Sequence, residues 1–258
     1  MPANYSGKSQ PLKINMKNKE SILVIIAARG GSKGLKNKNI KLLMGKPLIA
    51  HTILQAKKWG RATTIVCSTD SKKIAKLSER YGADVPFMRP KYLAGDKVAK
   101  TEVLRHALIK CENIYNKVYD IIVDLDVTSP IRKISDLDKC LRLFKKRRPK
   151  TLFSVTRSRR NPYFNMVEEK RDGRVSLCKT TGKRVFARQD APPVYDMNAS
   201  IYFYSRKYLI DIKDSTAISD NSCIYVMDEI SRFDIDSVLD FKFIEFLMKE
   251  RIWNNEVR

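Results

Sequence analysis

Apolar and polar positions follow two alternating patterns along most of this chain. Short apolar or β-branched runs predict buried strands at residues 22–28, 63–68, 84–87, 119–125 and 151–156. Apolar residues spaced three or four apart predict amphipathic helices at residues 48–59, 72–81, 100–115 and 136–146. Strands and helices that alternate in this way are typical of βαβ units. We therefore expect an α/β fold with a mostly parallel sheet and helices on both faces.

The alternation stops at about residue 157 and resumes after residue 197. Between them, basic and polar residues alternate with β-like pieces at 164–167 and 174–177, which predicts a small β-rich arm inserted at about 157–197. The pattern then predicts two strands and a closing helix, at residues 200–204, 222–227 and 237–249. Residues 1–20 are polar and lack a period, so we expect a disordered basic tail before a single domain at 21–258.

The first predicted strand runs into a glycine-rich, cationic loop at residues 29–39. Its basic side chains are Arg29, Lys33, Lys36 and Lys38. Backbone N–H groups and cations at the end of a strand bind phosphate chains, so we interpret the loop as a nucleoside triphosphate site. Neither the Walker A pattern nor Gly-x-Gly-x-x-Gly fits its spacing. A basic surface loop with no ligand is the alternative.

Two pairs of aspartates are candidates for a metal site. Asp234 and Asp236 are two residues apart in an extended segment, which places both carboxylates on one face. Carboxylates this close repel each other unless a cation lies beside them, and Mg²⁺ prefers oxygen ligands shared with phosphates. In the alternative, Asp236 caps the following helix. Asp124 and Asp126 repeat the spacing, and Asp-x-Asp also occurs in metal-dependent glycosyltransferases, which keeps that class of enzyme as a competitor.

Several of these polar groups follow predicted strands, at residues 29–38, 68–70 and 124–126. Ligands of open α/β sheets bind beyond the carboxyl ends of the strands, so we expect these groups to meet there. Loop cations on a triphosphate, with carboxylates holding a metal, predict nucleotidyl transfer. In that reaction an acceptor hydroxyl attacks the α-phosphate and pyrophosphate leaves.

The net charge of +23 raises the hypothesis of a nucleic-acid-binding protein. Basic residues are densest at 145–150, but no aromatic residues are interleaved there as stacking platforms, which disfavours this hypothesis. The five cysteines form no Cys-x-x-Cys pair, and two histidines are too few for a histidine-rich metal site. With no hydrophobic signal core and no apolar run that could span a bilayer, we expect a cytoplasmic protein without membrane contact.

Taken in order, the motifs resemble those of the CMP-sialic acid synthetase (acylneuraminate cytidylyltransferase) family. They lie at residues 28–35, 38–39, 68–70, 89–90, 93–96, 128–132, 198–202 and 234–236. The resemblance implies a Rossmann-like sheet of the nucleotide-diphospho-sugar transferase type. It also implies a cytidylyltransferase that joins CTP to a nine-carbon 2-keto sugar acid, releases pyrophosphate and works as a homodimer through the arm.

The resemblance also implies the roles of individual residues. The residues expected to bind CTP are Ala27, Ala28, Arg29, Gly30, Ser32, Lys33, Lys38, Asn39, Arg89 and Lys100. The residues expected to bind the sugar acid are Asp126, Thr128, Ser129, Phe164, Arg188, Gln189, Asp196, Asn198 and Tyr202. Asp234 and Asp236 would hold Mg²⁺, with Mn²⁺ as a substitute. The residues expected to be catalytic are Arg29, Lys33, Lys38 and Asp236.

Four positions depart from the pattern specific for sialic acid. Asp126 stands where that pattern has Gln, Phe164 where it has Lys, and Asp196 where it has Arg. Lys100 replaces a small polar residue beside the base. Polar partners of this kind distinguish hydroxyl from acetamido groups. Residues 160–165 and 195–200 look more like the branch that activates N,N′-diacetyllegionaminic acid for surface glycans, with N-acetylneuraminate as the alternative sugar.

Overall fold

A computed structural model describes residues 20–31, 34–183, 185–211, 216–250 and 252, and all structural statements below refer to them. The predicted disordered tail lies outside the described residues except for Glu20. Within the described part, no helix is both long enough and apolar enough to cross a membrane.

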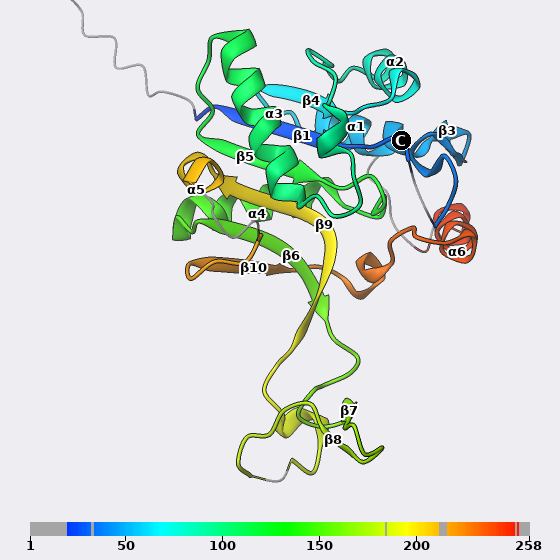
Figure 1. Ribbon diagram of the computed structural model, residues 1–258, viewed down its shortest axis with the longest axis vertical. Helices are drawn as coiled ribbons and strands as arrows, with labels where there is room; N and C mark the ends of the chain where they lie inside the picture. The colour runs from blue at the N-terminus through cyan, green and yellow to red at the C-terminus, as the bar shows by residue number, and fades with distance from the viewer. Residues whose placement is uncertain (1–19, 32–33, 184, 212–215, 251, 253–258) are drawn as a thin grey trace, which may run out of the picture.

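A six-stranded sheet forms the centre of the molecule (Figure 1). Its order is β10 (Ser222–Val226), β6 (Thr151–Arg157), β9 (Tyr195–Ser205), β5 (Ile121–Leu125), β1 (Ile22–Ala27) and β4 (Thr64–Ser68). β1 pairs in parallel with β4 and β5, and β10 pairs in parallel with β6. β9 returns from the arm and therefore runs antiparallel to both β5 and β6. The predicted α/β class with a mostly parallel sheet is confirmed.

Helices cover both faces of this sheet, as predicted (Figure 1). They are α1 (Leu48–Trp59), α2 (Lys72–Tyr81), α3 (Lys100–Tyr115), α4 (Ile134–Arg147), α5 (Arg206–Asp211) and α6 (Val238–Lys249). Short 3-10 turns join them at η1 (Lys38–Ile40), η2 (Lys91–Leu93), η3 (Arg188–Asp190) and η4 (Glu229–Arg232). The predicted limits of α1, α2 and α3 agree with the structure, whereas α5 and the small hairpin of β2 (Leu42–Leu43) and β3 (Lys46–Pro47) were not predicted.

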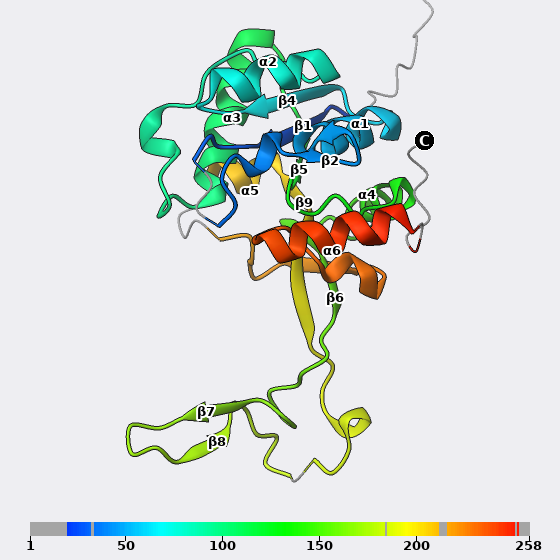
Figure 2. The same ribbon diagram turned by 90° about the vertical axis from the view of Figure 1, so that its right-hand side faces the viewer.

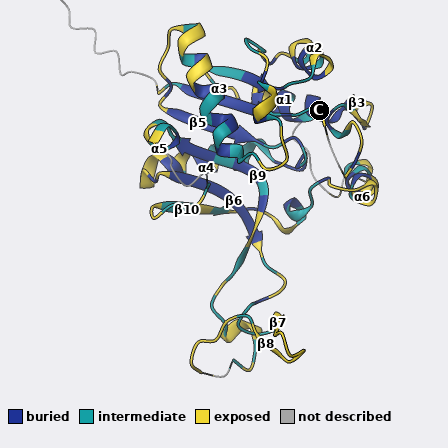
Figure 3. Cartoon of the chain, viewed as in Figure 1, coloured by how far each residue is buried: buried dark blue, intermediate teal, exposed yellow. Residues whose placement is uncertain are grey.

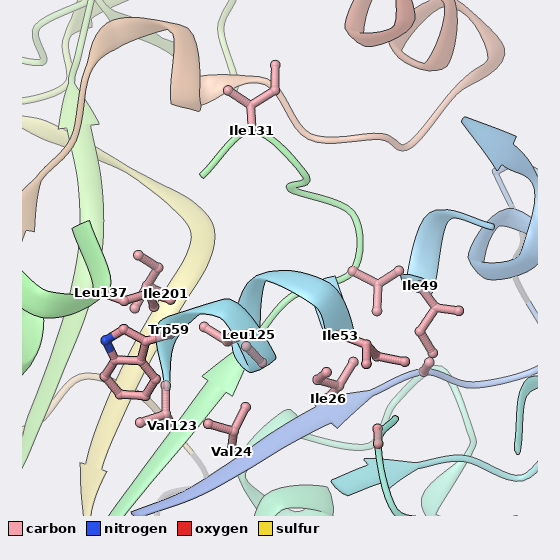
Figure 4. Close-up of a cluster of buried hydrophobic side chains, with 14 of the residues drawn as sticks. Val24, Ile26, Ile49, Ile53, Trp59, Val123, Leu125, Ile131, Leu137 and Ile201 are labelled. Carbon is pink, nitrogen blue, oxygen red and sulfur yellow. The ribbon is translucent and has the colours of Figure 1, made fainter. Parts of the chain in front are cut away.

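Alternating side chains of the central strands build two cores. On β1, Val24 and Ile26 face the cluster that includes Trp59 of α1, and Figure 4 shows part of this cluster. Leu23 and Ile25 point to the opposite face and pack with residues of α3 and α5. Because both faces are buried, the strand reads as a continuous apolar run in the sequence. Figure 3 shows that the central strands are largely buried, whereas the arm is largely exposed or half-buried.

The arm leaves the sheet where β6 and β9 extend beyond their neighbours, and it projects away from the core (Figure 2). It holds an antiparallel hairpin of β7 (Val167–Glu169) and β8 (Val175–Leu177), which agrees with the predicted β-rich insertion. The first β-like piece was misplaced, since Phe164 lies in a turn rather than a strand. The side chain of Asn161 accepts a hydrogen bond from the Tyr163 N–H at 2.9 Å, and such local bonds favour turns.

The predicted strand at residues 84–87 is also wrong. Asp84 makes one isolated parallel bridge to Val66, and the chain then turns away from the sheet. Arg89 lies two residues after Phe87, and its side chain donates hydrogen bonds to Ser68 at the end of β4. The segment therefore serves the candidate site rather than the sheet.

Candidate active site

A cleft of about 390 Å³ opens beyond the carboxyl ends of β1 and β5. Its lining residues are Ala27, Arg29, Gly34, Lys38, Asn39, Asp126, Thr128 and Asp236. Predicted residues for CTP, sugar and metal thus meet in one place, at the edge of the sheet where α/β proteins bind ligands. Ser32 and Lys33, which were also predicted to bind CTP, lie outside the described residues.

The end of β4 supports the glycine loop. Asp70 accepts a hydrogen bond from the backbone N–H of Gly30 at 2.8 Å. Arg89 is buried and donates from its Nε to Ser68 Oγ at 3.1 Å, and from Nη2 to the Ser68 carbonyl. Burial lowers the pKa of Arg89 from its usual value. Arg89, predicted to bind CTP, therefore directs these side-chain hydrogen bonds to the end of β4.

Arg29 is held by the segment that follows η2. Its guanidinium forms an ion pair with Asp96 at 2.7 Å. Asn39 is buried, and its side-chain amide donates to the Arg29 carbonyl at 2.9 Å. These contacts tie Arg29 both to the segment that follows η2 and to Asn39 of η1. They also explain why the side chain of Asn39, predicted to bind CTP, is fixed in orientation.

Lys38 contacts a segment that lies far from it in the sequence. Its ammonium donates to Asp236 Oδ1 at 2.8 Å and to the Ile235 carbonyl at 2.5 Å. Gly34 lies directly against the same segment, because a Cβ added there would overlap the Asp236 carbonyl oxygen. Sequence reasoning noted Gly34 as a loop glycine but missed this contact. The glycine is needed because another backbone approaches closely.

Asp234 lies close to two other negative charges. Burial raises the pKa of Asp234, and the charges of Asp236 and Asp126 raise it further. The side chain of Asp236 is 75% exposed. It does not cap α6: Ser237 does, accepting from the Asp240 N–H at 3.2 Å. The alternative in which Asp236 is a helix cap is therefore wrong: its carboxylate pairs with Lys38 and remains open to solvent.

A lysine lies between the two aspartates at the end of β5. Lys100 Nζ is 2.7 Å from Asp124 Oδ2 and 2.6 Å from Asp126 Oδ2. Burial would lower the pKa of Lys100, but the two carboxylates outweigh burial and raise it. For Asp126, burial acts to raise the pKa, yet Lys100 and the hydrogen bonds from Thr128 lower it to about 2. Asp126 is therefore ionised where it lines the cleft.

Three of the predicted sugar-binding residues contact residues around the cleft but do not line it. Asn198 is buried; it accepts from Ser154 Oγ at 2.7 Å and donates to the Ser231 carbonyl at 3.1 Å. Ser129 donates to the Asn198 carbonyl at 3.2 Å. The ring of Tyr202 lies 5.7 Å from the ammonium of Lys100. None of these three residues lines the cleft, and the bond between Ser129 and Asn198 ties the segment after β5 to β9.

The remaining predicted sugar-binding residues lie elsewhere in the chain. Arg188 and Gln189 line a second pocket of about 480 Å³ at the base of the arm, together with Arg157 and Tyr195. Phe164 lies in the arm, and Asp196 is an exposed residue of β9 opposite Thr156. A single copy of the described chain therefore does not gather these four residues at the cleft that holds Lys38 and Asp236.

Arg132 is a supporting residue that sequence reasoning did not single out. It is fully buried and donates to Gln55 Oε1 at 2.9 Å, to the Asp126 carbonyl at 2.9 Å and to the Ser200 carbonyl at 2.8 Å. It thus fixes the backbone that carries Asp126. Its place in the segment 128–132 was a usable signal, because an arginine next to a strand end often binds carbonyl or anionic oxygens.

The fold and the cleft define an α/β enzyme that acts on a nucleotide. A family model described as "Cytidylyltransferase" matches residues 23–257, and the chain belongs to this family. It is therefore a nucleotidyltransferase that uses CTP. This membership decides against the nucleic-acid-binding and glycosyltransferase hypotheses.

Two relatives are each 42% identical to this chain. One is "Post-translational flagellin modification protein B" of Campylobacter coli, matched over 89% of this chain and 96% of the relative. The other is "CMP-N,N'-diacetyllegionaminic acid synthase" of Campylobacter jejuni, matched over 88% of this chain and 94% of the relative. A solved structure of CMP:2-keto-3-deoxy-manno-octonic acid synthetase complexed with CTP has a similar fold, with a TM-score of 0.64 at 15% identity. That match covers 90% of this chain and 99% of the other.

Proposed function

We propose that this enzyme transfers the cytidylyl group of CTP to a nonulosonic acid, most specifically N,N′-diacetyllegionaminic acid, to give the CMP-sugar and pyrophosphate. The observation that carries the proposal is the meeting of Lys38 and Asp236 in one cleft, with Arg29 on one side and Asp126 on the other. Cations lie where a triphosphate would bind, and carboxylates lie where an acceptor hydroxyl would approach.

In the proposed reaction, the hydroxyl oxygen on the anomeric carbon of the sugar forms a bond to the α-phosphorus of CTP. The bond from that phosphorus to the bridging oxygen of the β-phosphate breaks, and pyrophosphate takes the electron pair. Arg29 and Lys38 stabilise the charge that develops on the leaving group, which is the largest contribution a protein makes to this kind of transfer. In this proposal, Asp236, which lines the cleft, accepts the proton of the attacking hydroxyl.

The chemistry of Asp234 and Asp236 suits a divalent ion. Burial raises the pKa of Asp234, the charges of Asp236 and Asp126 raise it further, and a bound cation would offset both effects. Asp234 and Asp236 would hold Mg²⁺, or Mn²⁺ in its place, through carboxylate oxygens. When bound, the ion would supply positive charge to offset that of the triphosphate.

The choice of sugar rests on two kinds of support. A relative at 42% identity is named for diacetyllegionaminic acid, and it matches nearly the whole chain. Asp126, at the cleft, is a hydrogen-bond acceptor that suits a hydroxyl or acetamido donor and disfavours a nearby carboxylate. N-acetylneuraminate is the second candidate, since the chemistry would be the same.

We further propose that the enzyme is a cytoplasmic homodimer formed through the arm. Apolar side chains of its hairpin are exposed, with Val167 at 60% and Val175 at 63%. Arg188 and Gln189 lie at the base of the same arm, away from the cleft of their own chain. A partner copy that covers the hairpin would bury this apolar surface and bring further side chains to a shared site.

The test is release of pyrophosphate from CTP and Mg²⁺ with a panel of sugar acids. Diacetyllegionaminate is expected to give the highest kcat/KM, with N-acetylneuraminate and pseudaminate lower. Turnover with N-acetylneuraminate alone would support the second candidate. No turnover with any of the three sugars would overturn the proposed function.

A further inference from the structure

The ammonium of Lys100 occupies the space between Asp124 and Asp126. Lys100 is the first residue of α3, where a positive charge opposes the helix dipole. Its position therefore depends on the carboxylates at the end of β5. Asp124 is completely buried, and its oxygens accept no hydrogen bond of good geometry from the described residues. The charge of Lys100, at 2.7 Å, is what compensates the burial of Asp124.

Most acceptor positions of Asp126 are already used. Its Oδ1 accepts from both the backbone N–H and the hydroxyl of Thr128, each at 3.1 Å. Its Oδ2 accepts from Lys100 at 2.6 Å, which leaves one lone pair on Oδ2. The side chain is 21% exposed and lines the cleft. The carboxylate therefore has a fixed orientation and room for one more donor.

We propose that Lys100 is a positioning residue: as the built-in cation of the Asp124–Asp126 pair, it excludes a divalent ion and presents Asp126 as a hydrogen-bond acceptor for a hydroxyl or acetamido N–H of the sugar acid. The part about the sugar rests on the proposed function. The exclusion of a divalent ion by Lys100 does not depend on the proposed function. An Asp-x-Asp segment thus acts in substrate recognition, while the metal is left to Asp234 and Asp236.

The cation part is tested by counting bound Mn²⁺ per chain with electron paramagnetic resonance, without CTP or sugar. K100A removes the cation and leaves space, so it is expected to bind one more Mn²⁺ than the wild type, and K100A/D126N is expected to lose this gain. K100R, which keeps the charge, is expected to match the wild type. No gain in folded K100A would overturn exclusion by Lys100.

A second arm of this test does not depend on the folding of K100A. D126N in the otherwise native chain is expected to keep the Mn²⁺ count, whereas D236N is expected to lower it. Loss of a Mn²⁺ ion in D126N would show that Asp126 is itself a metal ligand and would overturn the proposal. Because neither measurement uses the sugar, failure of the proposed function leaves this test intact.

The recognition part is tested with K100M/D124N, which replaces the buried Lys100–Asp124 ion pair with uncharged side chains. The variant keeps Asp126, which is partly exposed in the cleft, but removes the cation that orients it. The KM for the sugar acid is expected to rise about tenfold, the size of one lost charge-assisted hydrogen bond, with the KM for CTP within about threefold. K100R is expected to stay within about threefold for both substrates. An unchanged KM for the sugar, or a rise confined to CTP, would overturn the assignment of Lys100 and Asp126 to sugar recognition.

Discussion

Asp236 combines high exposure with a fixed position. Its carboxylate is held by Lys38, and its backbone is in contact with Gly34, although the side chain itself is open to solvent. An exposed ion pair of this kind contributes about 0–1 kcal/mol to folding. The arrangement is therefore suited to ligand chemistry at little cost in stability, and substitutions at these residues separate activity from folding.

We expect D236N to lower pyrophosphate release at least about 100-fold, because it removes the carboxylate to which the proposal assigns the metal and the proton of the hydroxyl. Its melting temperature is expected to stay within about 2 °C of the wild type, as for other weak surface pairs. D220N is the matched control: Asp220 is 77% exposed and pairs with Lys150 at 2.7 Å, and neither residue lines the cleft. Full activity in D236N would contradict the role given to this aspartate.

Gly34 offers a sharper test of the contact between loop and carboxylate. In G34A, the added Cβ overlaps the Asp236 carbonyl, so the loop and the aspartate segment must separate. We expect kcat/KM to fall at least about tenfold below that of G31A, where an added Cβ meets nothing within 4 Å. Steady-state kinetics on the two variants makes the comparison, and equal values would show that the contact does not matter for catalysis.

At the scale of elements, prediction succeeded where the pattern is local. The limits of α1, α2 and α3 follow from apolar spacing within each helix. The pairing of β9 with both β5 and β6 could not be read in this way, because it depends on a chain that returns from the arm. The same holds within the site: Gly34 with Asp236, and Lys100 with Asp126, meet only through tertiary packing, which leaves no periodic trace.

The segment between β5 and α4 depends on Arg132, so this arginine controls local stability. Burial lowers the pKa of Arg132 to about 10, which leaves it charged at neutral pH. A lysine cannot reproduce its forked set of hydrogen bonds. We expect R132K to lower the free energy of unfolding by about 3 kcal/mol in urea titrations, because buried acceptors lose their donors. R142K, at an exposed position of α4, is the control with a change near zero.

The junction of α3 and α5 gives a prediction about pH. Glu112 accepts two hydrogen bonds from Arg206, at 2.7 and 2.8 Å, which lower its pKa below the usual value. A carboxylate with a lowered pKa stabilises the fold above its unfolded pKa of about 4.3, and this contribution is lost as the pH falls through the folded value. The difference in unfolding free energy between wild type and E112Q is therefore expected to be about 1 kcal/mol at pH 7 and to shrink as the pH falls through the lowered pKa of Glu112. A difference that does not change as the solution is acidified would contradict the ion-pair account.

For the whole molecule, the cores and the arm are separate structural units. Within the described chain, neither buried cluster includes a residue between Arg157 and Tyr195. The arm was predictable as an insertion because its composition interrupts the alternation of elements. Its proposed role in a dimer depends on contacts with a second chain. The sequence of one chain contains the apolar residues that such contacts require, but it does not show the surface that would cover them.

We therefore expect a variant with residues 160–192 replaced by a short Gly-Ser linker to keep its core. Its melting temperature should lie within about 5 °C of the wild type, since no core contact is removed. Light scattering should show a monomer where the full chain is a dimer, and turnover should fall with the loss of the shared site. A truncated variant that is still dimeric and active would contradict the role proposed for the arm.

The contact between Lys38 and Asp236 joins residues 198 positions apart. During synthesis, chains emerge from the amino end and their early segments fold first, whereas contacts of such long separation form late. The loop at residues 29–39 is thus made early, whereas Asp236, the partner of Lys38, follows only 198 positions after it. Under the proposed function, a nascent chain that has not reached this segment carries Arg29 and Lys38 without Asp234 and Asp236. It therefore lacks the residues to which the metal and the proton of the hydroxyl are assigned.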